Sequence, residues 1–162
     1  MKRASITISI LGALLIGGVV GARADESADN EKVAKSFIAS WTTKPIDEIV
    51  GHLDEHVVFI NIPDPKPIKG RADAKKFLEP FFQKDPLIVP FVFKTDVKHV
   101  VASGGTVMLD RVDSFTIAGK TWEVPVATLF EMKNGKITVW KDYFDQAQFQ
   151  APLTMLENLM KK

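Results

Sequence analysis

The chain has 162 residues, 46% of them hydrophobic and 25% charged, which excludes a disordered tail, a collagen-like fibre and a multi-span membrane protein. It carries 21 basic and 20 acidic residues, so no large field of either sign favours nucleic acid as a partner. It has no cysteine, which excludes disulfides, thiolate nucleophiles and Cys-ligated metals. We therefore expect one domain that is stabilised by packing alone.

The first 24 residues have the pattern of a secretory signal peptide. Lys2-Arg3 precedes an uncharged, apolar run over 4–22, and Ala22-Arg23-Ala24 supplies the small residues that a signal peptidase recognises. The alternative is an uncleaved anchor, but the run contains several glycines and is short for a membrane span of about 20 residues. We expect cleavage after Ala24 and export to a periplasm or out of the cell. The mature domain, 25–162, then has no stable membrane span.

Helices are expected in the first part of this domain. Apolar residues at helical spacing predict a helix from a cap at Asn30 to Trp41. A short second helix is expected from Ile46 to about Leu53, followed by a strand over Val57–Ile62 that several prolines stop. A third helix is expected after Gly70, ending near Pro80.

From Phe91 onward the pattern is typical of an antiparallel meander. Tight turns are expected at Ser103-Gly104-Gly105, Ala118-Gly119 and Asn134-Gly135, the last a strong type I′ hairpin signal. They separate the expected strands Phe91–Ala102, Thr106–Ile117, Lys120–Lys133 and Lys136–Phe144, and a closing helix follows over Pro152–Met160. This order indicates an α+β domain, in which a curved, mainly antiparallel sheet folds around the N-terminal helices and leaves an apolar pocket for a small ligand.

Polar side chains interrupt three of the apolar strand faces. Alternation places Arg111 and Asp113 on the same face as Leu109 and Phe115, Asp142 beside Trp140 and Phe144, and Asn61 beside Val57 and Phe59. A buried charge costs several kcal/mol unless it has partners, so these groups are candidates for a site. The alternative is a cross-strand salt bridge on the solvent side of the sheet.

The same segments resemble a known family. Arg111-Val112-Asp113, the hairpin at Gly119-Lys120 and the run from Gly135 to Asp145 are similar to the limonene-1,2-epoxide hydrolase family, within the nuclear-transport-factor-2-like (NTF2-like, SnoaL-like) superfamily of cone-shaped α+β domains. The likeness extends from Glu31 to about Phe149 and includes Asn61-Ile62-Pro63. It implies an NTF2-like cone.

The resemblance also implies a reaction: cofactor-free opening of a small hydrophobic epoxide by water in one step. By position, Asp142 matches the base that activates the water and Asn61 the side chain that holds it. Asp113 matches the acid that protonates the epoxide oxygen, and Arg111 the group that bridges both carboxylates. Two Asp residues can act as base and acid only if their surroundings push their pKa values apart.

The resemblance further implies pocket residues and a partner. Val124, Val126 and Phe144 are expected to line the pocket, and Phe59 occupies the position of a Tyr that also holds the water in the family. Similar domains pair through the outer face of the sheet, which makes a homodimer the expectation. Because the Tyr hydroxyl is missing, two alternatives stay open: a non-catalytic binding module for an apolar ligand or partner, and an isomerase or cyclase of the same superfamily.

The sequence supports a zinc site or a serine nucleophile less well than it supports the Arg–Asp site. His52-Leu53-Asp54-Glu55-His56 matches the H-x-x-E-H pattern of one class of zinc protease, which requires one continuous helix. Here Val57 already begins a strand, so we expect no metal. The G-x-S-x-G motif of a serine hydrolase is absent.

Overall fold

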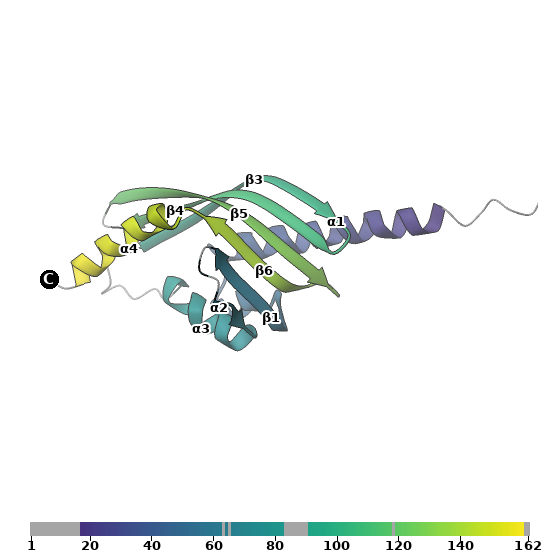
Figure 1. Ribbon diagram of the computed structural model, residues 1–162, viewed down its shortest axis with the longest axis horizontal. Coiled ribbons are helices and arrows are strands. Elements are labelled where there is room, and N and C mark those ends of the chain that lie inside the picture. The colour runs from purple at the N-terminus through teal and green to yellow at the C-terminus, as the bar shows by residue number, and fades with distance from the viewer. Residues whose placement is uncertain (1–16, 63, 65, 83–90, 118, 161–162) are drawn as a thin grey trace, which may run out of the picture.

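One curved sheet with helices against its inward face makes up the fold (Figure 1). The structure, a computed structural model, describes residues 17–62, 64, 66–82, 91–117 and 119–160. The helices are α1 (Gly17–Ser40), α2 (Ile46–Val50), α3 (Arg71–Phe82) and α4 (Gln146–Met160). The strands are β1 (Leu53–Ile62), β2 (Ile68–Lys69), β3 (Phe91–Ser103), β4 (Thr106–Ile117), β5 (Lys120–Lys133) and β6 (Lys136–Phe144).

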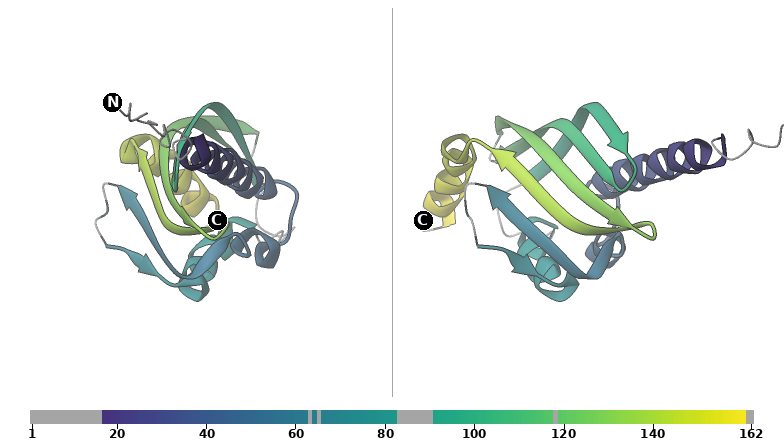
Figure 2. Two further views of the ribbon diagram at one scale, coloured as in Figure 1. Left: turned by 90° about the vertical axis from the view of Figure 1, so that its right-hand side faces the viewer. Right: turned by 45° about the vertical axis from the view of Figure 1, so that its right-hand side comes forward.

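The strands lie in the order β2-β1-β6-β5-β4-β3, and Figure 2 shows the sheet curving around α1. Neighbouring strands are antiparallel except β1 and β6, which pair in parallel. The bounds of β4, β5 and β6 are the predicted ones, because tight turns fix both ends of β4 and β5 and the start of β6. In the last turn Asn134 and Gly135 both have positive φ, 52° and 69°, as a type I′ turn requires. The predicted α+β class with a mainly antiparallel sheet is confirmed.

The first helix differs from the prediction at its beginning. α1 starts at Gly17, so Asn30 lies inside the helix and is not its cap. The Asn30 side chain is buried instead, and its amide donates to the Gly104 carbonyl at 3.0 Å. The Gly104 N–H donates in turn to Ser27 Oγ at 2.7 Å. These two bonds attach α1 to the β3–β4 turn.

Other boundaries also shift. β1 begins at Leu53, four residues before the predicted Val57, because Leu53 already pairs with Ile137 of β6. α3 continues past Pro80 to Phe82, and the short strand β2 was not predicted. α4 begins at Gln146, six residues before the predicted start, because Asp145 caps it: its Oδ1 accepts the Ala147 N–H at 2.9 Å.

The core lies between the inward face of the sheet and helices α1, α2 and α3. Phe37 of α1 is fully buried against Trp140 of β6, with ring centroids 5.2 Å apart in an edge-to-face contact. Ile49 of α2 and Ala74 of α3 are equally buried in the same cluster. The helices therefore cover the inward face of the sheet, and α3 also lines the pocket there through Phe77 and Leu78.

Most of the predicted signal peptide lies outside the described residues. The segment 1–16 is not described, and α1 already includes Ala22 and Ala24. No described helix is long and apolar enough to cross a membrane. Cleavage after Ala24, export and the homodimer stay predictions.

Candidate active site

Three adjacent strands bring polar side chains to one place on the inward face of the sheet. β4 contributes Arg111 and Asp113, β5 contributes Thr128, and β6 contributes Asp142. Thr128 lies directly opposite Asp142 in the β5–β6 register. Asn61 of β1 lies opposite Asp142 from the other side, in the parallel β1–β6 pair. The strand register therefore gathers residues that are far apart in the chain.

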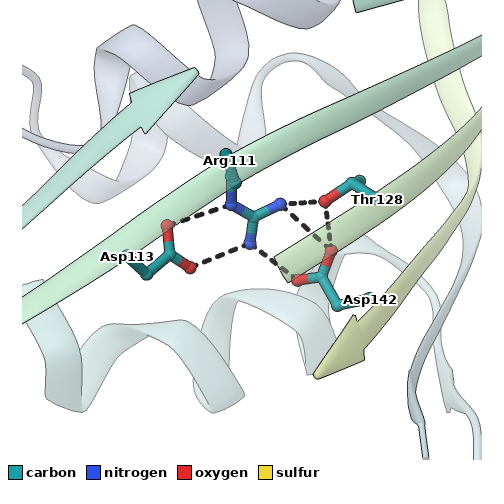
Figure 3. A network of polar contacts seen from close by, with 4 residues as sticks. All are labelled: Arg111, Asp113, Thr128 and Asp142. Atoms are coloured by element: carbon teal, nitrogen blue, oxygen red, sulfur yellow. Dashed lines mark hydrogen bonds and ion pairs between the residues drawn. The ribbon is translucent and has the colours of Figure 1, made fainter. Parts of the chain in front are cut away.

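The guanidinium of Arg111 uses all five of its N–H donors within this group (Figure 3). Nε and Nη2 donate to the two oxygens of Asp113, both at 3.0 Å. Nη2 also donates to Asp142 Oδ2 at 3.0 Å and Nη1 to Asp142 Oδ1 at 3.2 Å. Nη1 donates its second hydrogen to Thr128 Oγ1, which donates onward to Asp142 Oδ1 at 2.7 Å. One Arg thus holds both carboxylates.

This group is buried, so the alternative of a salt bridge on the solvent side is wrong. Arg111 is 1% exposed, and Asp113 and Asp142 are each 5% exposed. Taking one partner away from such a buried pair costs about 3–5 kcal/mol, since it leaves a charge without compensation. A Lys could not replace Arg111, because an ammonium lacks the planar fork that binds two carboxylates at once.

Burial and the neighbouring charges shift the pKa values of Asp113 and Arg111, and so determine which of these side chains carries a proton. Removal from water raises the pKa of Asp113, the negative charge of Asp142 adds to the rise, and the bonds from Arg111 oppose it without cancelling it. For Arg111, burial alone would lower the pKa, but the two carboxylates more than offset that effect and raise it. Arg111 therefore stays charged. A proton on Asp113 makes the Arg111–Asp113–Asp142 group neutral overall when Asp142 is ionised.

The carboxylates face an apolar pocket whose cavity volume, the space open to the centre of a water molecule, is about 70 Å³. All the residues predicted for the site line it, namely Phe59, Asn61, Arg111, Asp113, Val124, Val126, Asp142 and Phe144. The far wall is aromatic: Phe115 of β4 and Phe149 of α4 meet edge to face, with centroids 5.5 Å apart. The pocket therefore joins a polar wall to an apolar enclosure.

Phe59 contributes a ring and no hydroxyl to this pocket. It is 2% exposed and stacks on Trp140, with ring centroids 3.8 Å apart and planes 20° from parallel. Tyr143 does not supply the missing group, because alternation turns it outward and it is 42% exposed. Among the described residues, Asn61 is thus the neutral polar side chain that lines the pocket beside Asp142.

Sequence reasoning missed Thr128 and several pocket walls. Thr128 lies on the inward face of β5 with Val124, Val126 and Phe130, so its alternation marks it as a polar residue on a buried face. Trp41 comes from the turn after α1 and Phe149 from α4, and no strand pattern could place them against the sheet. As for metals, no cluster of His, Asp and Glu within the described ranges could hold an ion.

Comparison with known proteins agrees with this geometry. Residues 28–156 match the model of the limonene-1,2-epoxide hydrolase catalytic domain. The chain belongs to this family. The epoxide hydrolase EphG of Mycobacterium tuberculosis is 34% identical over 53 residues, so the alignment covers 33% of this chain and only about a third, 36%, of that relative.

Solved structures show the same fold. An LEH-like epoxide hydrolase from M. tuberculosis superposes with a TM-score of 0.67 at 24% identity, over 83% of this chain and 97% of that one. A protein described as a SnoaL-like polyketide cyclase, from Jannaschia sp. CCS1, gives 0.65 at 15% identity, over 77% and 91%. The predicted NTF2-like fold is confirmed.

The raised pKa of Asp113 predicts how stability depends on pH. Between its ordinary value of 3.8 and the higher folded value, the folded chain binds more protons than the unfolded chain, so the free energy of unfolding falls as pH rises. Asp113→Asn lacks this dependence and loses only a constant contribution from Arg111. We expect the Tm of the wild type to fall relative to that of Asp113→Asn as pH rises from about 4. A Tm difference in thermal melts that is constant, or that moves in favour of the wild type, contradicts the shift.

Proposed function

We propose that this chain is an epoxide hydrolase that adds water to a small apolar epoxide and releases a vicinal diol. The observation that carries the proposal is the pair of carboxylates on one buried guanidinium, at the wall of an apolar pocket. The raised pKa of Asp113 supports its role as the acid, and family membership supports the reaction type. The pocket's walls favour an apolar substrate of modest size.

The proposed reaction needs one proton to leave and one to arrive. Asn61 holds a water, and Asp142 takes its proton while the water oxygen bonds to an epoxide carbon. The carbon–oxygen bond of the epoxide breaks, and its oxygen takes the proton of Asp113. Arg111 stays charged throughout and stabilises whichever carboxylate is ionised. Transfer of one proton from Asp142 to Asp113 through solvent restores the starting state, so no cofactor is required.

The two carboxylates are the direct test of this proposal. We expect Asp142→Asn and Asp113→Asn each to lower kcat/KM by about 10²–10⁴-fold, since each removes one of the two proton transfers. The double variant should lose little more than either single variant, because both groups act in one transition state. The kcat/KM of each variant is measured from the rate of diol formation with a panel of cyclic and alkyl epoxides, monitored by chromatography.

Asp110→Asn is the matched control. Asp110 lies on the same strand as Asp113 but is exposed, and it pairs with His99 Nδ1 at 2.9 Å on the outer face. Its replacement should leave kcat/KM unchanged. A wild-type protein that forms no diol from any epoxide contradicts the proposal, and so does Asp142→Asn protein with ordinary turnover.

Phe59 favours a second candidate function, a binding module that keeps the cone without the chemistry. Where the resemblance expects a Tyr hydroxyl against the water, this chain has a ring stacked on Trp140. The hydrolase proposal holds that the water is bound with one partner fewer and the reaction is only slower. The binding-module proposal holds that no activated water is present.

Phe59→Tyr separates the two candidates. If the chain is a hydrolase, the added hydroxyl gives the water another partner and should raise kcat/KM by up to about tenfold, the effect of one well-placed hydrogen bond. Tm measured alongside shows whether the buried position accepts the hydroxyl. A binding module would instead show thermal stabilisation by apolar ligands, with neither form producing diol.

A further inference from the structure

The hydroxyl of Thr128 lies between Arg111 and Asp142 and can point in one direction only. Thr128 is completely buried, and its Oγ1 accepts an N–H from Arg111 Nη1. Since a guanidinium can only donate, the hydroxyl hydrogen is directed to Asp142 Oδ1, 2.7 Å away (Figure 3). Thr128 therefore relays one donor of Arg111 to the carboxylate.

This relay makes the two oxygens of Asp142 different. Oδ1 accepts from both Thr128 Oγ1 and Arg111 Nη1, which occupies its two acceptor sites. In the part of the chain that the structure describes, Oδ2 accepts only from Arg111 Nη2, at 3.0 Å, and keeps one acceptor site. The contacts also resist rotation of the carboxylate, because exchange of the two oxygens would break three hydrogen bonds.

We infer that Thr128 is a positioning residue that fixes the base Asp142, and that Oδ2 is the oxygen that takes the proton from the water. The inference rests on the proposed hydrolase function and deepens it. Thr128 itself is not among the residues that line the pocket, so it acts on the reaction through Asp142 rather than by touching substrate.

The surroundings of Asp142 make the effect of Thr128 separable from that of other groups. Within the described residues, the charged groups that face the Asp142 carboxylate come from β4. Arg111 is in direct contact with Asp142, and Asp113 binds the opposite side of the Arg111 guanidinium. β1 and β5 contribute the neutral Asn61 and Thr128. Loss of the hydroxyl thus removes a hydrogen bond to the ionised carboxylate without changing any charge.

The experiment compares Thr128→Val, which has the same shape but no hydroxyl, with Thr128→Ser, which keeps the hydroxyl. Against an epoxide that the wild type hydrolyses, we expect Thr128→Val to lower kcat by about tenfold or more with KM nearly unchanged. The acidic limb of its kcat/KM profile should move to higher pH, because one bond that favours the ionised base is gone. Thr128→Ser should recover most of the rate and the wild-type limb.

Thr138→Val is the control, since Thr138 Oγ1 donates only to the Glu131 carbonyl, at 3.0 Å, on a neighbouring strand. It should leave both the rate and the pH profile unchanged. A Thr128→Val enzyme with the wild-type limb overturns the inference, and so does a Thr128→Ser enzyme that is equally impaired. If the wild-type protein forms no diol, that result overturns the proposed function itself. The positioning role of Thr128, which rests on that function, is then overturned as well.

Discussion

Burial of a single guanidinium determines what the rest of this fold must provide. Arg111 has five N–H donors and is 1% exposed, so each donor needs an acceptor inside the protein. Two carboxylates and one hydroxyl supply the acceptors, and they come from three adjacent strands. The cost of burying a second negative charge then falls on Asp113, whose pKa rises in consequence. The same arrangement of buried charge places the proposed base, Asp142, beside the proposed acid, Asp113.

The sheet can meet this demand because its register is fixed. The β5–β6 hairpin turns at Asn134-Gly135, and a register shift between Glu131 and Met132 then sets Thr128 opposite Asp142. The parallel β1–β6 pair sets Asn61 on the other side of Asp142. A shift of one residue in either pairing would turn a polar side chain to the outer face. Curvature of the sheet around α1 leaves room in front of these groups, and α4 brings Phe149 to the far wall of the pocket.

The sequence predicted the meander and the charged cluster, for reasons that are local. Tight-turn residues mark both ends of β4 and β5 and the start of β6, and alternation reveals Arg111 and Asp113 on an apolar face. Sequence patterns did not predict the features that depend on tertiary contacts. Asn is a residue type that often caps helices, yet the Asn30 side chain instead donates a hydrogen bond to the carbonyl of Gly104, 74 residues away in the chain. Thr128 is an ordinary strand residue until the register places it against Asp142, and the partners of a threonine cannot be inferred from alternation alone.

The central claim is that Asp142 acts as a base toward water and does not attack the epoxide itself. A single turnover in ¹⁸O-labelled water, with enzyme in excess over epoxide, tests this most directly, because the first product records the source of its new oxygen. Direct addition of water predicts a diol that carries ¹⁸O in the first turnover and an Asp142 carboxylate that stays unlabelled by mass spectrometry of its peptide. Unlabelled diol from the first turnover would mean that a carboxylate oxygen is transferred, and would contradict the account.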